Sequence, residues 1–136
     1  MTTLHRRSFT VIVAGGRDYA LTDDDRQYLS SLGITELWTG GCRGVDEDAE
    51  SWAKWNEIPV KTYPANWVKH GRSAGPRRNK RMAQELQGNT LGRVAVVLFP
   101  GGRGTESMRR EAKKAGLVIM ERCRRRDVQM RKEDQE

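Results

Sequence analysis

Residues 93–106 read RVAVVLFPGGRGTE, an apolar run that stops abruptly at a proline and three glycines. The almost continuous apolar character of residues 93–99 is typical of a strand buried on both faces, as in the centre of a parallel sheet. After the glycines we expect a helix from Thr105 to Ala115, with Gly116 ending it. A buried strand, a glycine turn and a helix in this order indicate one unit of an α/β fold.

The same alternation recurs along the chain. Short apolar runs rich in β-branched residues predict further strands at residues 9–14, 36–39, 60–63 and 117–120. Start signals and helical spacing predict helices at residues 22–31, 45–55 and 76–86. Strands that alternate with helices over the whole chain predict an α/β domain with a mostly parallel sheet of about five strands and right-handed crossovers.

Length and charge narrow the class of protein. The 136 residues are enough for one domain with its own core, and no apolar run approaches the roughly 18–20 residues of a membrane span. The first residues lack an apolar signal segment and the two cysteines lack CxxC spacing, so we expect a cytoplasmic protein with no membrane partner. The net charge is +7, with seven Lys and Arg and no acid in residues 58–84, which favours anionic partners such as phosphates, nucleotides or nucleic acid.

Three of the predicted strands end in a glycine pair, at residues 15–16, 40–41 and 101–102. The carboxyl ends of parallel strands meet at one edge of the sheet, which is where open α/β sheets bind ligands. Glycine lets a ligand approach the backbone, and the start of the helix after each turn offers unpaired N–H groups to an anion. Thr105 would cap its helix or bond a phosphate oxygen. The alternative is that these are purely structural turns.

The first two turns carry charged candidates. Arg17 could bind a phosphate as a fork and Asp18 a ribose hydroxyl, unless the two simply pair with each other. In the second turn Gly44 lets the chain enter the helix, and Asp46 either contacts the ligand or complements the helix dipole. Cys42 lies in the same turn without a nearby histidine base, so we do not expect it to be a nucleophile.

Residues 64–83, PANWVKHGRSAGPRRNKRMA, combine an aromatic side chain with several cations. Trp67 could stack on a base, with His70 or Arg72 near a phosphate; the alternative for Trp67 is a core or lid position. Arg78 and Asn79 begin a predicted helix close to the expected site, where polar groups are seldom needed for packing alone.

Four ordered motifs, GGRDY, GGCRGVDEDAESWA, YPANWVKHGRSAGPRRNKRM and FPGGRGTESM, resemble the SLOG superfamily, the group that contains the Lonely Guy phosphoribohydrolases and the DprA DNA-processing proteins. Within it the chain is most similar to the small single-domain YspA-like branch, common in bacteria and their phages, over about residues 8–120. The resemblance implies a Rossmann-like three-layer sandwich with helices on both faces of the sheet. It also implies the binding, for sensing or processing, of a nucleotide or a nucleotide-derived ligand.

The Lonely Guy pattern PGGxGTxxE is matched at Pro100, Gly101, Gly102, Gly104 and Thr105, and the upstream RKxxM-like segment at Arg78 and Met82. The position of the catalytic glutamate is occupied by Met108. Glu106 lies two residues earlier, so its side chain would point about 200° away on a helix.

The missing glutamate leaves the activity open. Asp18, Asp46 or Glu106 would have to supply the carboxylate if the chain hydrolyses an N-glycosidic bond of a nucleoside monophosphate. DprA-like nucleic-acid binding is the other alternative, because the chain is basic and its C-terminal run is rich in arginine.

The expected organisation is a nucleotide-binding domain at residues 1–121 and a charged tail at residues 122–136. The expected ligand-binding residues are Gly15, Gly16, Arg17, Asp18, Gly40, Gly41, Gly44, Asp46, Trp67, His70, Arg78, Asn79, Pro100, Gly101, Gly102, Gly104 and Thr105. His5, His70 and Cys42 lack ligand spacing, so we expect no metal site and no cofactor, beyond a divalent ion that could accompany the phosphate. A homodimer could form through the tail or through Trp52 and Trp55.

Overall fold

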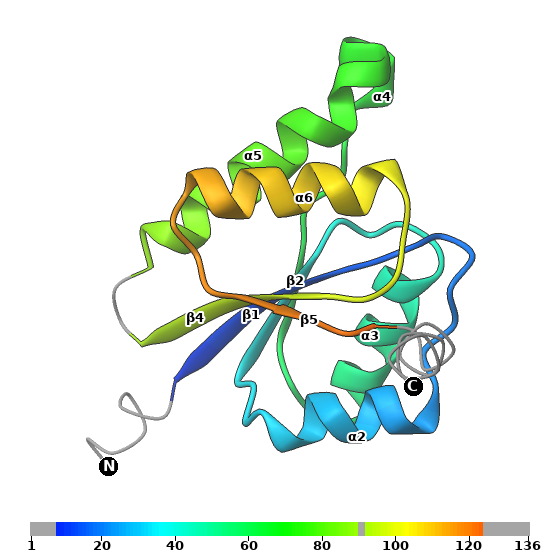
Figure 1. The fold of residues 1–136 in the computed structure, drawn as a ribbon, viewed down its shortest axis with the longest axis vertical. Helices are drawn as coiled ribbons and strands as arrows, with labels where there is room; N and C mark the ends of the chain where they lie inside the picture. Colours follow the sequence, from blue (N-terminus) through cyan, green and yellow to red (C-terminus); the bar gives the residue numbers. More distant parts are fainter. Residues whose placement is uncertain (1–7, 90–91, 124–136) are drawn as a thin grey trace, which may run out of the picture.

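The computed structural model describes residues 8–89 and 92–123 of the chain. Five strands form one sheet: β1 (Phe9–Ala14), β2 (Glu36–Thr39), β3 (Val60–Thr62), β4 (Arg93–Leu98) and β5 (Ile119–Glu121). All neighbours are parallel and their order is β3-β2-β1-β4-β5, which places β1 at the centre between β2 and β4. The predicted α/β fold with a parallel sheet of five strands is confirmed (Figure 1).

Helices cover both faces of the sheet, as the three-layer prediction requires. On one face lie α2 (Asp23–Ser31) and α3 (Val45–Trp55), and on the other lie α5 (Ala74–Gln87) and α6 (Arg103–Lys114) (Figure 1). Alternate residues of β1 serve the two cores: Val11 and Val13 pack with the α2–α3 layer, and Ile12 packs with the α5–α6 layer. The sheet is therefore buried on both faces, which explains why β4 reads as an uninterrupted apolar run.

Several predicted boundaries move. Thr22 does cap α2, in a capping box with Asp25, and both Gly33 and Gly116 adopt positive φ just after a helix as expected. However, α5 and α6 each begin two residues before the predicted start, and β5 lies at residues 119–121 rather than 117–120.

The predicted loop before α5 contains two short helical segments, α4 (Trp67–His70) and η1 (Gly71–Ser73). Asn66 caps α4 by accepting a hydrogen bond from the Lys69 amide. This segment projects beyond the sheet at the N-terminal end of α5 (Figure 1).

The two helical layers carry opposite charge. α5 and α6 together contain nine Lys and Arg against three Glu, whereas α2 and α3 contain seven Asp and Glu against two basic residues. The basic segment predicted to attract anions thus lies mostly on the α5–α6 side of the sheet. Within the described residues, no helix is both long and apolar enough to cross a bilayer.

The predicted tail, residues 122–136, falls outside the described residues except for Arg122 and Cys123. Arg122 bonds the buried carboxylate of Asp25 at 3.2 Å and lies over the ring of Tyr28. Of the two tryptophans considered for a dimer, Trp52 is buried in the core, so only Trp55, which is 89% exposed, can serve an interface.

Candidate functional site

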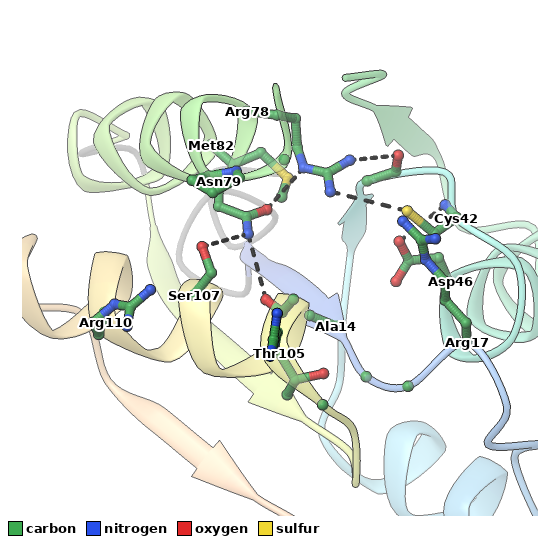
Figure 2. A pocket seen from close by; sticks show the side chains of 18 of the residues that line it. Ala14, Arg17, Cys42, Asp46, Arg78, Asn79, Met82, Thr105, Ser107 and Arg110 are labelled. Atoms are coloured by element: carbon green, nitrogen blue, oxygen red, sulfur yellow. Dashed lines mark hydrogen bonds between the residues drawn. The ribbon is translucent and has the colours of Figure 1, made fainter. Parts of the chain in front are cut away.

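A cavity of about 550 Å³ opens at the carboxyl edge of the sheet, between the strand-end turns and the α5–α6 layer. Figure 2 shows Arg17, Cys42 and Asp46 on one side of it and side chains of α5 and α6 on the other. Twelve of the predicted ligand-binding residues line it: Gly15, Gly16, Arg17, Asp18, Gly40, Asp46, Trp67, Arg78, Asn79, Gly102, Gly104 and Thr105. The sheet edge therefore does gather residues from all three turns.

Part of the glycine pattern has a structural cause. The Gly16 amide donates a hydrogen bond of 2.8 Å to the Pro100 carbonyl, so the first and third turns lie backbone against backbone. A Cβ on Gly101 would lie 2.6 Å from the Gly16 nitrogen, and one on Gly44, whose φ is +82°, would lie 2.5 Å from the Arg17 carbonyl oxygen. Residues larger than glycine would push the turns apart, so the structural alternative is right for these positions.

No neighbouring atom among the described residues requires glycine at position 102 or 104. A Cβ built on either would meet nothing within 4 Å, and both residues line the cavity. They leave the N-terminus of α6 open: Gly102 is its N-cap, and no side chain caps the helix. The first amides of a helix have no intrahelical acceptor, and the helix dipole makes that end attractive to an anion.

Thr105 is not the N-cap that we expected, because α6 begins at Arg103 and places Thr105 in its first turn. The side chain is 4% exposed, and its Oγ1 is buried without a hydrogen-bond partner among the described residues. A buried hydroxyl with no partner costs free energy unless something else supplies the bond. Among the described residues no group supplies that bond.

Arg78 joins α5 to the second turn. Its Nη1 donates to the carbonyls of Gly40, at 2.8 Å, and Tyr63, at 3.1 Å, while Nε donates to Asn79 (Figure 2). Asn79 in turn donates to the Ser107 hydroxyl at 3.1 Å, which ties α5 to α6. The predicted arginine and asparagine thus hold the two sides of the cavity together and also line it.

Asp46 is the only predicted carboxylate that is buried in the cavity wall, at 6% exposure. Burial raises the pKa of its carboxyl group to about 6, although the hydrogen bond from the Cys42 amide and the charge of Arg78 partly offset this effect. A carboxyl group that titrates near neutral pH can hold or release a proton during chemistry.

Asp18 does not pair with Arg17, as one alternative proposed. It pairs with Arg43 at 3.1 Å, and both side chains are largely exposed. Arg17 instead lies over the ring of Trp67, with its guanidinium carbon 5.9 Å from the ring centroid. Trp67 is 46% exposed, lines the cavity and faces Gly75, so it is neither a core residue nor fully in solvent.

Five predicted residues do not line the cavity: Gly41, Gly44, His70, Pro100 and Gly101. Glu106 also lies outside the cavity wall and forms an exposed ion pair with Arg109. Met108 is buried in the core between the sheet and α6, an apolar position in which a carboxylate would need a partner.

The sequence reasoning missed three polar residues of α6 that line the cavity, Arg103, Ser107 and Arg110. Their spacing of i, i+4 and i+7 marks one face of a helix and could have revealed them. Cys42 also lines the cavity, with Sγ 3.9 Å from Arg78 Nη2. In the described part of the chain no three His, Cys, Asp or Glu side chains group together as metal ligands would.

Two comparisons with known proteins bear on this site. Residues 9–70 match the family described as the YspA, cpYpsA-related SLOG family, which covers the first two glycine turns and Trp67. The chain is also 35% identical over 104 residues to the Gene 61 protein of Mycobacterium phage D29, an alignment that covers 71% of this chain and 77% of the phage protein. The fold, the ordered motifs and these matches agree: the chain belongs to the YspA-like branch of the SLOG superfamily.

Proposed function

We propose that the protein binds a nucleotide or nucleotide-derived ligand in the cavity at the carboxyl edge of its sheet. The observation that carries the proposal is the buried, unpartnered hydroxyl of Thr105 beside the uncapped N-terminus of α6. Three hydrogen-bonding elements would meet a phosphate there: the first amides of α6, the Thr105 hydroxyl and the cationic side chains of Arg103 and Arg110.

The nucleoside would extend from the phosphate toward Trp67. An exposed aromatic ring at the cavity mouth can stack on a base, and Arg17 already lies over this ring. The open space above Gly102 and Gly104 lets a phosphate approach the backbone closely. The membership of the SLOG superfamily supports a nucleotide-related ligand in general, and the cavity supports this placement of it.

Calorimetry against nucleoside mono-, di- and triphosphates, cyclic dinucleotides and ADP-ribose derivatives tests the proposal. We expect saturable binding by at least one phosphate-bearing compound and no binding by the matching nucleoside without phosphate. If none of these compounds binds at millimolar concentration, the proposal fails. A substitution outside the cavity wall, Arg77→Gln, is the matched control for loss of one positive charge near the site.

A second candidate function is hydrolysis of the N-glycosidic bond of a nucleoside monophosphate. Asp46 favours it, because a buried carboxyl group with a pKa of about 6 is mostly deprotonated at neutral pH and yet basic enough to accept a proton. The carboxylate would accept a proton from water as the water oxygen bonds to C1′ of the ribose. The bond from C1′ to the base would break, and the base would leave with its electron pair and take up a proton.

Overnight incubation with nucleoside monophosphates, followed by chromatography, tests this second function. It predicts equal amounts of free base and ribose 5-phosphate, and loss of both products with Asp46→Asn. Binding without base release from any common monophosphate would leave the protein as a binder or sensor of nucleotides.

A further inference from the structure

A second hollow, of about 360 Å³, adjoins the main cavity and is lined by three arginines, Arg17, Arg43 and Arg78. It contains no acidic residue in its wall, whereas the main cavity contains Asp18 and Asp46. The two spaces share Trp67, Gly40 and Cys42 as well as two of these arginines, so one ligand can occupy both. Three guanidinium groups around one hollow make a positive potential that an anion would neutralise.

Arg78 forms no salt bridge among the described residues, and the nearby carboxyl of Asp46 interacts with its charge only at longer range. The Arg78 side chain is nevertheless partly buried. Nη1 and Nε bond to neutral carbonyl and amide oxygens, and Nη2 has only the thiol sulfur of Cys42, a weak acceptor, at 3.9 Å. A partly buried guanidinium with one poorly satisfied nitrogen, facing a hollow, is a site for an anion.

The other two arginines are available to the same anion. Arg17 contacts the Trp67 ring and forms no ion pair with any carboxylate in the described part of the chain. Arg43 pairs with Asp18, but both side chains are largely exposed, and such surface pairs contribute little. A phosphate that enters the hollow can therefore recruit Arg43 without breaking a strong interaction.

The hollow is separate in construction from the phosphate site at α6. The hollow is built by the β1–α2 and β2–α3 turns together with Arg78 of α5. The phosphate site is built by the N-terminal turn of α6, with Thr105, Arg103 and Arg110. Trp67 lines the space common to both. A ligand with a single phosphate would leave one of these two anion sites without a partner.

We propose that the ligand carries two separate anionic groups, one at the N-terminus of α6 and one in the hollow of Arg17, Arg43 and Arg78, with a nucleoside against Trp67 between them. This inference rests on the proposed function and narrows its ligand class. Nucleoside bisphosphates, and two nucleotides joined through phosphate, share the required chemistry; a nucleoside monophosphate does not.

The test compares three probes by calorimetry, each in an adenine and a guanine series: the nucleoside 5′-monophosphate, the nucleoside 3′,5′-bisphosphate and the 5′-phosphorylated dinucleotide. The variants are Arg43→Gln, which removes the exposed arginine of the hollow that does not line the main cavity, Thr105→Val at the α6 site, and Arg77→Gln as a control outside both. Circular dichroism verifies that each variant is folded.

We expect a two-phosphate probe to bind about 10- to 100-fold more tightly than the monophosphate, as one added charge-assisted phosphate contact allows. Arg43→Gln should reduce this gain and change monophosphate binding by less than about threefold. Thr105→Val should weaken the binding of all three probes. Arg77→Gln should weaken the binding of none of them by more than the loss of one exposed charge allows. If the dinucleotide binds more tightly than the bisphosphate, the ligand belongs to the class of two nucleotides joined through phosphate. If the bisphosphate binds more tightly, the ligand belongs to the nucleoside bisphosphates.

Three results would overturn the inference in different ways. If the monophosphate binds in a manner that depends on Thr105 but a second phosphate adds nothing, the two-anion inference is wrong and the proposed function stands. If Arg43→Gln weakens the monophosphate as much as the bisphosphate, the monophosphate already occupies the hollow and the inference is also wrong. If none of the three probes binds, the two-anion inference fails, and the proposed function fails with it only if the wider panel of phosphate-bearing compounds does not bind either.

Discussion

Replacing Thr105 by valine should make the protein more stable and a poorer binder at the same time. Valine keeps the shape of the side chain and removes only the hydroxyl, whose oxygen is buried without a partner among the described residues. An unpaired buried hydroxyl costs about 1–3 kcal/mol, and threonine and valine have similar helix propensities. We therefore expect Thr105→Val to raise the free energy of unfolding of the ligand-free protein by about 1–2 kcal/mol.

The same substitution should weaken a phosphate-bearing ligand, because a hydrogen bond to a charged group contributes about 1.5–3 kcal/mol. This corresponds to a loss of affinity of roughly 10- to 150-fold. Thr105→Ser is the matched control: it keeps the hydroxyl and loses one buried methyl group, so it should lower stability by about 1 kcal/mol and preserve affinity.

Urea unfolding with an unchanged m value measures the stability of the two variants, and calorimetry with the ligand measures their affinity. The reasoning is refuted if valine lowers stability as serine does, since the hydroxyl would then be satisfied in the free protein. It is refuted equally if valine leaves affinity unchanged, since the hydroxyl would then have no part in binding.

Three further predictions concern glycine and buried carboxylates. Gly101→Ala should lower the free energy of unfolding by about 2 kcal/mol or more, because a Cβ there collides with the first turn. Gly104→Ala should fold normally and weaken ligand binding. Stability and affinity measurements on both variants test this contrast. The folded-state pKa of Asp46, about 6, lies above its ordinary value of 3.8. The contribution of Asp46 to stability is therefore largest below pH 4 and declines by about 3 kcal/mol as the pH rises through 6. In urea unfolding at a series of pH values, Asp46→Asn should flatten this decline, and an unchanged slope would contradict the prediction. Burial alone would raise the pKa of Asp25, but the hydrogen bonds that its carboxylate accepts, including that from Arg122, lower this pKa. Arg122→Ala should therefore reduce the free energy of unfolding at pH values above the ordinary carboxyl pKa. The effect should become smaller as the pH falls below that value.

The sheet and its turns could be predicted from the sequence because three of the five strands end in a glycine pair. The apolar run of β4 and the glycine pairs after β1, β2 and β4 predict the parallel sheet and the edge at which its cavity lies. The charge of the basic segment predicts an anionic partner without reference to packing, and this stays a prediction.

The side-chain pairings could not be predicted, because they depend on which turns meet in space. Asp18 pairs with Arg43, which is 25 residues away, rather than with its neighbour Arg17. Thr105 looks like an N-cap by its residue type, but the backbone enters the helix two residues earlier and buries its hydroxyl. Sequence periodicity does not reveal the four-residue helix α4, which is too short to show a repeat.

The roles of the individual glycines also needed the structure. Gly101 and Gly102 are adjacent and identical in type, yet a Cβ on Gly101 collides with the first turn and one on Gly102 meets open space. The distinction depends on the Thr105 hydroxyl, which a Cβ on Gly101 would meet first, and on the neighbouring turn whose Gly16 amide donates to Pro100. One of the two glycines therefore serves packing, and the other leaves room at the helix N-terminus.

The central claim is that a phosphate-bearing ligand lies at the N-terminus of α6, and titration of ¹⁵N-labelled protein with nucleoside phosphates, followed by backbone amide shifts, tests it most directly. We predict saturable shifts of the Arg103, Gly104 and Thr105 amides, which are absent when the matching nucleoside without phosphate is added. Saturable binding whose largest shifts lie away from these three amides would contradict the claim, as would the absence of any shift at millimolar ligand.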